Sequence, residues 1–220
     1  MVSRSIGTNI GTIYGTGTAS ITSGASTVTF SGATLPSNIG EGDSLVIATT
    51  VFFIQSRVST TQATIQGTAS ATLTAQTYRI KRAHNTLQAW EDAANLRGID
   101  LVVRNVVEKG VCYNDGIFTA GITIDGSTTD VAHYLWLTVA PGHRHTGRAG
   151  TGVRVDPVLV DEDIYVVDNF TIVEWLEVTG YFGTYNEGIY VENGGCIIRN
   201  NIVHDLQNNN LGYVAGGGIW

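Results

Sequence analysis

The sequence predicts an all-β protein with a small N-terminal β-sandwich or barrel, a short capping helix and a parallel β-helix. Two observations support this prediction. The 220 residues include 27 Gly but 3 Pro and 14% charged residues, and Ser, Thr, Val and Ile are abundant. This composition is typical of strands joined by many turns. Short runs with period-two alternation of apolar side chains recur along the chain, and this period indicates strands rather than helices.

An internal repeat near the C-terminus predicts the parallel β-helix. The stretches 170–180 and 196–206 share one alternation of apolar and polar residues, 26 residues apart, and the stretches 188–190 and 218–220 resemble each other. The first repeat aligns Phe170 with Cys196, Ile172 with Ile198, Trp175 with Asn201 and Leu176 with Ile202. Such repeats are typical of solenoids, in which each unit buries its apolar side against its neighbours. The pair Asn200-Asn201 is expected at a corner between strands, because Asn tolerates left-handed backbone angles.

The N-terminal part is expected to form a separate small β module over residues 15–82. Turn signals rich in Gly separate its short apolar runs at the spacing of an antiparallel sandwich or barrel. The expected strands are 18–22, 26–30, 43–47, 51–54, 62–65 and 77–80. Charged residues are scarce between Arg4 and Arg57, so this surface is either a Ser- and Thr-coated exterior or a face covered by neighbouring subunits. Residues 1–14 are polar and Gly-rich and predict a leader that is flexible or ordered by a partner.

One helix is predicted, over residues 85–98, at the start of a second domain that spans 83–220. Asn85 is the expected N-cap, and Gly98 is placed to end the helix. Five apolar residues are expected on one face of this helix: Leu87, Trp90, Ala93, Ala94 and Leu96. Such a helix would cap the first coil, whose interior and strand edges would otherwise face water. Strands resume after Ile99, at 101–104, 106–107, 121–125, 134–139, 152–155 and 164–167.

Charge and composition exclude several classes of function. A formal net charge of -7, with no basic run, argues against nucleic acid as the partner. No apolar stretch has the length of a signal peptide or a membrane span, so we expect no membrane partner and synthesis in the cytoplasm. Cys112 and Cys196 lie in apolar runs and are expected to be buried free thiols rather than a bridge. We expect no cofactor, because the Gly-rich stretch 147–152 lacks the Lys-Ser/Thr ending of a phosphate loop.

Two parts of the chain resemble known proteins. The segment from Gly15-Thr-Gly-Thr-Ala-Ser-Ile-Thr22 to Tyr78-Arg-Ile80 resembles small β modules of bacteriophage structural proteins. The segments Thr86-Leu-Gln-Ala-Trp-Glu-Asp-Ala93 and Asn200-Asn-Ile-Val-His204 are similar to right-handed parallel β-helix proteins of the pectate-lyase-like type, which include phage tailspikes. This resemblance covers roughly residues 84–220. It implies a right-handed coil, a helix that plugs the N-terminal end, and symmetric homo-oligomers.

An enzyme of this class would be a glycoside hydrolase or a polysaccharide lyase. A hydrolase needs two acids facing one cleft, roughly 5 to 10 Å apart, and Glu174, Glu177 and Glu187 are the candidates. Five aromatic residues could stack on sugar rings: Trp175, Tyr181, Phe182, Tyr185 and Tyr190. These rings could equally lean on the wall of the solenoid. A lyase needs a basic residue beside calcium-binding acids, and Arg199 is the one basic residue after Arg154. We therefore expect no catalytic residues.

Two places in the sequence are candidate metal sites. His143 and His145 would share one face of a strand, but they lie between two Gly-containing turns and lack a third ligand. The acidic residues around Asp161 and Asp163 lack the spacing of an EF-hand loop. We expect a solvated loop at both places and no metal.

These observations favour a structural protein of a virus particle, such as a capsid decoration or a tail appendage, or of a similar extracellular assembly. Its expected partners are other virion or assembly proteins and further copies of itself, bound through protein–protein contacts. The first alternative is a carbohydrate-binding or polysaccharide-degrading protein, whose partner would be a polysaccharide. The second is a fragment of a secreted adhesin whose signal sequence is missing.

Overall fold

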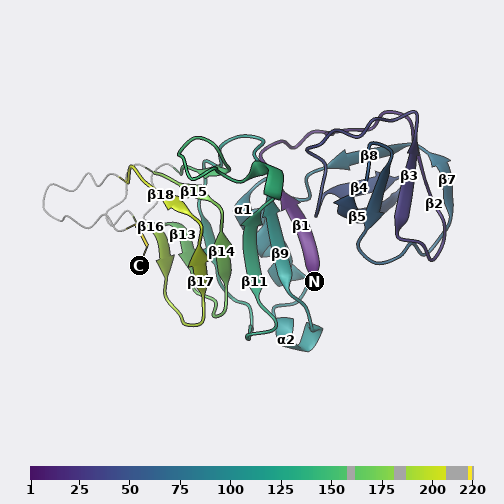
Figure 1. The fold of residues 1–220 in the computed structure, drawn as a ribbon. Coiled ribbons are helices and arrows are strands. Elements are labelled where there is room, and N and C mark those ends of the chain that lie inside the picture. Colours follow the sequence, from purple (N-terminus) through teal and green to yellow (C-terminus); the bar gives the residue numbers. More distant parts are fainter. Residues whose placement is uncertain (158–161, 181–186, 207–217, 220) are drawn as a thin grey trace, which may run out of the picture.

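The computed structural model describes residues 1–157, 162–180, 187–206 and 218–219 (Figure 1). The chain is predominantly β with few helices, so the all-β prediction is confirmed. The strands form three parallel sheets and one antiparallel sheet. In Figure 1 the antiparallel sheet lies on the right and the parallel sheets on the left, so the two kinds of sheet stand side by side.

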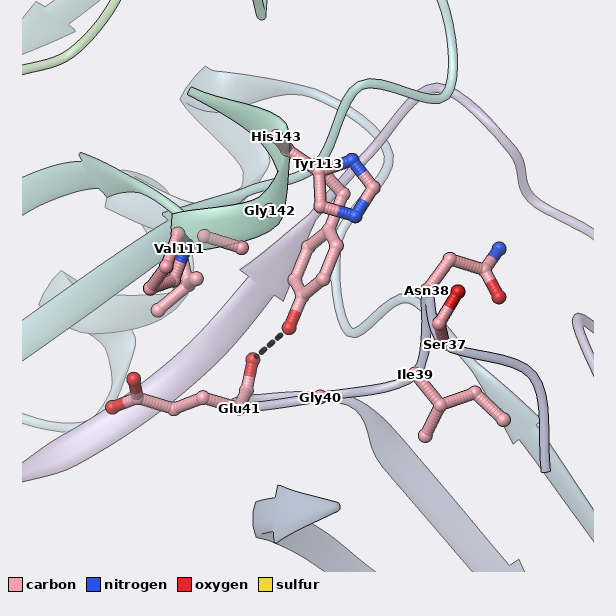
Figure 2. A pocket seen from close by; sticks show the side chains of 11 residues that line it. Ser37, Asn38, Ile39, Gly40, Glu41, Val111, Tyr113, Gly142 and His143 are labelled. Carbon is pink, nitrogen blue, oxygen red and sulfur yellow. Dashed lines mark hydrogen bonds between the residues drawn. The ribbon is translucent and has the colours of Figure 1, made fainter. Parts of the chain in front are cut away.

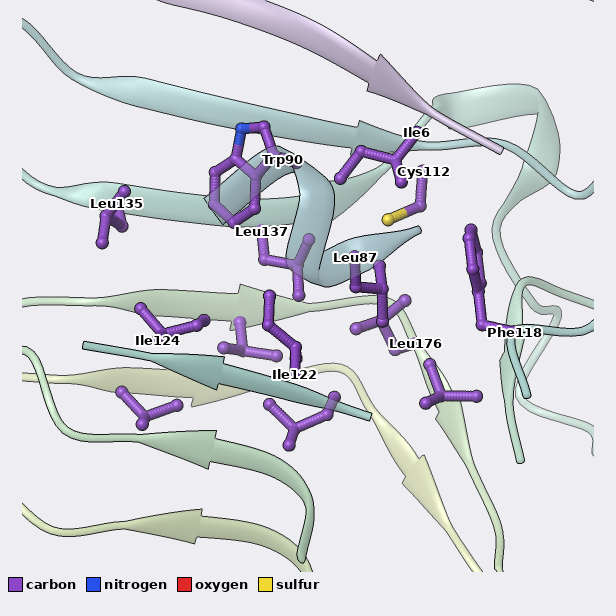
Figure 3. Packing of buried hydrophobic residues seen from close by; sticks show 14 of the residues in the cluster. Ile6, Leu87, Trp90, Cys112, Phe118, Ile122, Ile124, Leu135, Leu137 and Leu176 are labelled. Carbon is purple, nitrogen blue, oxygen red and sulfur yellow. The ribbon is translucent and has the colours of Figure 1, made fainter. Parts of the chain in front are cut away.

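The parallel sheets surround one hydrophobic core (Figure 3), which includes the fully buried Leu135, Leu137 and Val139. The five-stranded sheet has the order β1 (Val2–Ile6), β9 (Glu108–Cys112), β11 (Leu135–Val139), β14 (Ile172–Glu174), β17 (Ile197–Arg199). The second sheet has the order β10 (Ile122–Ile124), β13 (Glu162–Val166), β16 (Glu187–Val191). The third has the order β12 (Arg154–Val155), β15 (Glu177–Val178), β18 (Ile202–Val203).

The pairing register near the C-terminus differs from the predicted repeat by one residue. Ile172 pairs with Ile197 and Val173 with Ile198, an offset of 25 residues (197 minus 172) instead of 26. A shift of one residue moves every side chain of a strand to the opposite face. Val173 therefore enters the core, whereas Ile172 and Glu174 face away from it. The left-handed residues repeat with the same offset, since Trp175 has φ 67° and Asn200, between β17 and β18 as predicted, has φ 55°.

The predicted right-handed parallel β-helix is wrong as a description of this fold. The structure consists of separate parallel sheets beside a curled antiparallel sheet, and no right-handed parallel β-helix is evident among the described residues. The sequence pattern does not contain enough information to predict this architecture. Period-two alternation predicts strands, and a repeat predicts which strands pair, but neither determines how the sheets are joined or with which hand.

The predicted helix is present as α1 (Leu87–Leu96), with Thr86 instead of Asn85 as its N-cap. The Thr86 hydroxyl accepts a hydrogen bond from the Ala89 N–H at 3.0 Å. Leu87 and Trp90 are buried against β10, β1 and β9, where α1 covers one end of the core (Figure 3). Leu96 is 88% exposed, contrary to prediction. At 100° per residue Leu96 lies about half a turn from Leu87, so the two side chains cannot share one face.

A second short helix, α2 (Leu101–Arg104), replaces the strand predicted at the same residues. Asp100 caps this helix, because its carboxylate accepts a hydrogen bond from the Val103 N–H at 2.9 Å. Asn105 ends it in the left-handed conformation, with φ 52°. A run of branched apolar residues predicts a strand, and these local caps override that preference. None of the helices in the described part of the chain is long and apolar enough to span a membrane.

The antiparallel sheet is curled and encloses a core of its own, which includes Leu45, Ile47, Ile54 and Ile80. Its seven strands have the order β7 (Leu73–Gln76), β2 (Thr18–Ile21), β3 (Thr27–Ser31), β6 (Gln62–Ile65), β5 (Thr50–Arg57), β4 (Ser44–Ile47), β8 (Tyr78–Lys81). The sequence pattern misses β7, because this strand contains one large apolar residue, Leu73, and shows no alternation.

The first residues of the chain belong to the parallel sheet and are no flexible leader. Strand β1 pairs with β9 over its whole length, and Ile6 is fully buried. The polar residues of β1 face the antiparallel sheet and are bonded there. The Ser3 hydroxyl donates to Glu41 at 2.7 Å, and the Ser5 hydroxyl accepts from the Ala83 N–H at 2.9 Å. The polar composition that predicted a leader therefore reflects a strand between two sheets.

Candidate functional site

Arg82 fixes the antiparallel sheet to the parallel sheets. Its side chain is 1% exposed and donates to Asp43 at 2.7 Å and to Asp115 at 2.6 Å. The guanidinium carbon also lies 3.6 Å from the centre of the Tyr113 ring. A buried cation is tolerated when it is paired and hydrogen-bonded, and here two carboxylates and an aromatic ring surround it. Asp43 precedes β4 of the antiparallel sheet, and Asp115 follows β9 of the five-stranded sheet. The cluster therefore holds the antiparallel sheet and the parallel sheets in one arrangement.

Glu41 provides a second connection between the two parts. Its carboxylate lies 2.9 Å from Lys109 Nζ on β9 and accepts a hydrogen bond from Ser3 on β1. The Tyr113 hydroxyl donates to the Glu41 carbonyl oxygen at 2.9 Å (Figure 2). These contacts hold the loop 37–41 against the five-stranded sheet and define the wall of a cleft.

The cleft between this loop and the parallel sheets has a volume of about 350 Å³ (Figure 2). One wall is the loop 37–41, and the other contains Val111, Tyr113 and the turn 141–143. His143 lies in this turn, with its ring 5.0 Å from that of Tyr113. Burial, followed by the charge of Arg82, lowers the pKa of His143, so the imidazole is neutral at pH 7. Its Nδ1 accepts the Asn114 N–H at 3.1 Å, which places the ring proton on Nε2.

The residues that line the cleft are suited to binding a small group rather than to catalysis. It offers apolar side chains and a donor at His143, whereas the Glu41 carboxylate is already bonded to Lys109 and Ser3. Proton transfer between two acids would need a second carboxylate facing the same space, and no other acid among the described residues lines this cleft.

The predicted acid Glu174 is a structural residue on the outer face of the five-stranded sheet. Its carboxylate accepts hydrogen bonds from Trp136 at 3.0 Å, Thr138 at 2.9 Å and Arg199 at 2.7 Å. Burial acts to raise the pKa of Glu174, but the hydrogen bonds from Arg199, Thr138 and Trp136 outweigh it and lower the pKa below its usual value. An ionised carboxylate with three donors, 2% exposed, is poorly suited to proton transfer.

The other two predicted acids lie on other sheets. Glu177, on β15, is 1% exposed and accepts from the Gly150 N–H at 2.6 Å, with His204 Nε2 at 3.1 Å. Glu187 lies on β16, beside Glu162 of β13. The structure thus places Glu174, Glu177 and Glu187 on three different sheets, and it does not bring them together as a pair facing one cleft.

The predicted aromatic set is divided in the same way. Trp175 lies between β14 and β15, with its ring 5.6 Å from His145 and 4.7 Å from the Arg144 guanidinium. Tyr190 lies on β16 and packs against Tyr165 of β13 at 5.5 Å. The other three members, Tyr181, Phe182 and Tyr185, fall outside the described residues. Trp175 and Tyr190 form no platform of stacked rings, since Trp175 lies at the corner between β14 and β15 and Tyr190 lies on β16.

The candidate metal ligands do not converge. His143 faces Tyr113, whereas His145 is buried, contacts the Asn200 carbonyl oxygen at 2.7 Å and accepts the Gly147 N–H. Asp161 lies outside the described residues. Asp163 is buried, and burial together with Asp156 raises its pKa to about 7. Across the described residues, no group of three or more His, Cys, Asp or Glu side chains could hold a metal ion.

The cluster that sequence reasoning missed is the one around Arg82. Asp43, Arg82 and Asp115 are separated by more than thirty residues each, so no local spacing brings them together. The one available local signal was the short basic stretch that ends the predicted strand, in which Arg82 follows Arg79 and Lys81. Comparison of the chain with family models, curated proteins and solved structures finds no match, so the resemblance to tailspike-type proteins is not upheld.

Proposed function

We propose that this chain is a structural protein that acts through contacts with other proteins, as a rigid subunit of an assembly. Two features support this role over catalysis. Three residues that could have served a reaction, Glu174, Glu177 and His145, are engaged in internal hydrogen bonds. The buried Arg82 cluster joins the antiparallel sheet to the parallel sheets, which suits a subunit of fixed shape.

The observation that carries the proposal is an exposed apolar surface at the end of α1 and on α2. Four aliphatic side chains within eight residues face solvent there, a group that we call the 96–103 patch. Their exposed fractions are 88% for Leu96, 53% for Ile99, 37% for Val102 and 82% for Val103. Single exposed aliphatic residues are ordinary, but a group of them marks an interaction surface.

The 96–103 patch stands on a rigid base. Glu108 is fully buried beneath it and pairs with Arg97 at 2.8 Å and with Arg104 at 2.6 Å. The Asp100 cap and the ion pairs therefore hold both ends of the segment in place. A preformed apolar surface loses little conformational entropy on binding, which favours its use as a contact site.

We take the partner to be another subunit of the same assembly, a further copy of this chain in the simplest case. A virus particle or a similar extracellular assembly is the setting that the sequence analysis predicted, and this proposal fits that setting. The 14% of charged residues, with few on the antiparallel sheet, suits surfaces that are covered by neighbours.

The test is a comparison of two Val→Asp variants by sedimentation velocity. Val103→Asp places a charge in the 96–103 patch, and Asp near the N-terminus of α2 is compatible with the helix. Val58→Asp is the matched control, because Val58 is 56% exposed and directly follows β5, outside the 96–103 patch. We expect wild type and Val58→Asp to associate and Val103→Asp to sediment as a monomer. Equal association of the two variants would contradict the proposal.

A further inference from the structure

Within the described residues, three basic residues of this acidic chain have charged groups without a partner. Of the 12 Lys and Arg residues, six form ion pairs: Arg82, Arg97, Arg104, Lys109, Arg154 and Arg199. Another three bond to carbonyl oxygens: Arg4, Arg57 and Arg144. Within the part of the chain that the structure describes, Arg79, Lys81 and Arg148 remain.

Two of these three cations line the same groove. Arg79 and Lys81 lie two residues apart on β8 and so project from the same face of the strand, away from the core that holds Tyr78 and Ile80. Arg79 pairs across the sheet with Val46, and Lys81 with Ser44. Neither neighbour on β4 is acidic.

The groove runs over the outer face of β8, β4 and β5 and has a volume of about 460 Å³. Its floor faces away from the core and is nevertheless buried, since Ser44 is 5% and Val46 is 7% exposed. Side chains on both sides produce this burial. Arg79 and Lys81 form one wall, and Val51 and Phe53 form the other. The buried floor distinguishes this place from an ordinary charged strand surface.

A third cation adjoins the apolar wall. The guanidinium carbon of Arg4 lies 3.4 Å from the centre of the Phe53 ring, and Arg4 donates to the Ser3 carbonyl oxygen and to Gln66. No carboxylate lines the groove among the described residues. Like charges on one strand face repel each other, and a bound anion would relieve this repulsion.

We propose that this groove binds a small ligand that carries an oxyanion beside an apolar ring or chain. The oxyanion, a carboxylate, sulfate or phosphate group, would lie between Arg79 and Lys81, where charge-assisted hydrogen bonds hold it. The apolar part would lie against Val51 and Phe53 on the opposite wall. This site is separate from the 96–103 patch and does not rest on the role in assembly.

Phenyl phosphate, inorganic phosphate and benzyl alcohol are the probes for this site. The isotope-labelled full chain is titrated with each, and backbone amide shifts are followed by NMR. We expect phenyl phosphate to bind more tightly than either inorganic phosphate or benzyl alcohol, with shifts at residues 44–53 and 79–83. The binding should weaken as salt is added, since the pair is partly exposed. No saturable shift at about 10 mM phenyl phosphate, or shifts centred elsewhere, would overturn the proposal.

Substitutions of the cations distinguish binding in this groove from nonspecific binding of anions to exposed cations. The double change Arg79→Gln/Lys81→Gln should weaken phenyl phosphate binding at least about tenfold, as expected for lost hydrogen bonds to a charged group. Arg148→Gln is the matched control, because Arg148 is exposed, pairs with none of the described acids and lies outside the groove. If thermal melts show that the double variant does not fold, each single variant should still bind several-fold more weakly than Arg148→Gln. Unchanged binding in the groove variants would overturn the proposal.

Discussion

Glu174 and Arg199 are direct register partners on β14 and β17, and their side chains meet at 2.7 Å on the outer face of the sheet. The sequence alone does not reveal that Arg199 is the partner of Glu174, because Arg199 lies on β17, the neighbouring strand in the sheet. Glu174, an acidic residue beside an aromatic residue, thus stabilises the pairing of β14 with β17.

Glu174→Gln should lower the free energy of unfolding by about 1–3 kcal/mol, because a buried acceptor of three hydrogen bonds loses its charge. The folded-state pKa of Glu174 is depressed, so its contribution is present above the unfolded pKa and is lost as the pH falls through the folded pKa. Urea denaturation of both proteins at several pH values measures this. Curves that differ equally at neutral and strongly acidic pH would speak against the assignment.

Arg82→Ala should destabilise the chain by about 3–5 kcal/mol, because it leaves Asp43 with an unpaired buried carboxyl group. Arg148→Ala is the control, since Arg148 is exposed, and it should change stability by less than about 0.5 kcal/mol. Thermal unfolding compares the two variants. Similar melting of Arg82→Ala and wild type would show that the buried cluster does not hold the two parts together.

Gly110→Ala should be destabilising because of its position under Trp90. A Cβ atom at Gly110 would lie 2.8 Å from the indole and 2.9 Å from Ile6, both fully buried. Overpacking of this kind costs about 1–3 kcal/mol. Gly142→Ala is the matched control, because its Cβ would meet nothing within 4 Å. Chemical denaturation should separate the two variants, and equal stability would mean that α1 does not pack on β9 as described.

His204 should titrate above the usual pH of a histidine. Burial acts to lower the pKa of His204, but the contacts with Asp205 and Glu177 outweigh it and raise the pKa. Its contribution to stability is therefore present below the unfolded pKa of 6.5 and is lost as the pH rises through the folded pKa. NMR titration of the His204 ring measures the value. The rise should become smaller in Asp205→Asn, and an unchanged pKa of His204 in that variant would contradict the contact with Asp205.

The two thiols should differ in reactivity. Cys112 is fully buried, and burial raises the pKa of its thiol far above the usual value, whereas Cys196 is half-buried. A disulfide reagent should therefore label one thiol per chain in the folded protein and two after denaturation. Cys196→Ser should abolish the labelling of the folded protein. Labelling of two thiols without denaturant would contradict the burial of Cys112.

The sequence predicted those elements of the fold that depend on residues close together in the chain. Alternation along β3 and β6 predicted their strands, and the spacing of Leu87, Trp90 and Ala94 predicted α1 and its buried face. The thiol state of both cysteines also agrees with the prediction, although Cys196 is less buried than expected.

The remaining features depend on contacts between distant residues. The polar strand β1 shows no apolar alternation strong enough to be recognised, and its role is defined by β9, about a hundred residues later. The register of Ile172 was wrong by one residue because two overlaid segments leave such a slip unresolved. The groove beside Arg79 was missed since its opposite wall, Phe53, belongs to another strand.

The mass of the purified chain in solution tests the central claim, that this protein acts through contacts between subunits. Light scattering after size-exclusion chromatography would measure it over a wide range of concentrations. The account predicts a mass that is a defined multiple of 23.4 kDa, or one that grows with concentration, and that returns to a monomer in Val103→Asp. A mass of one chain at every concentration would contradict it.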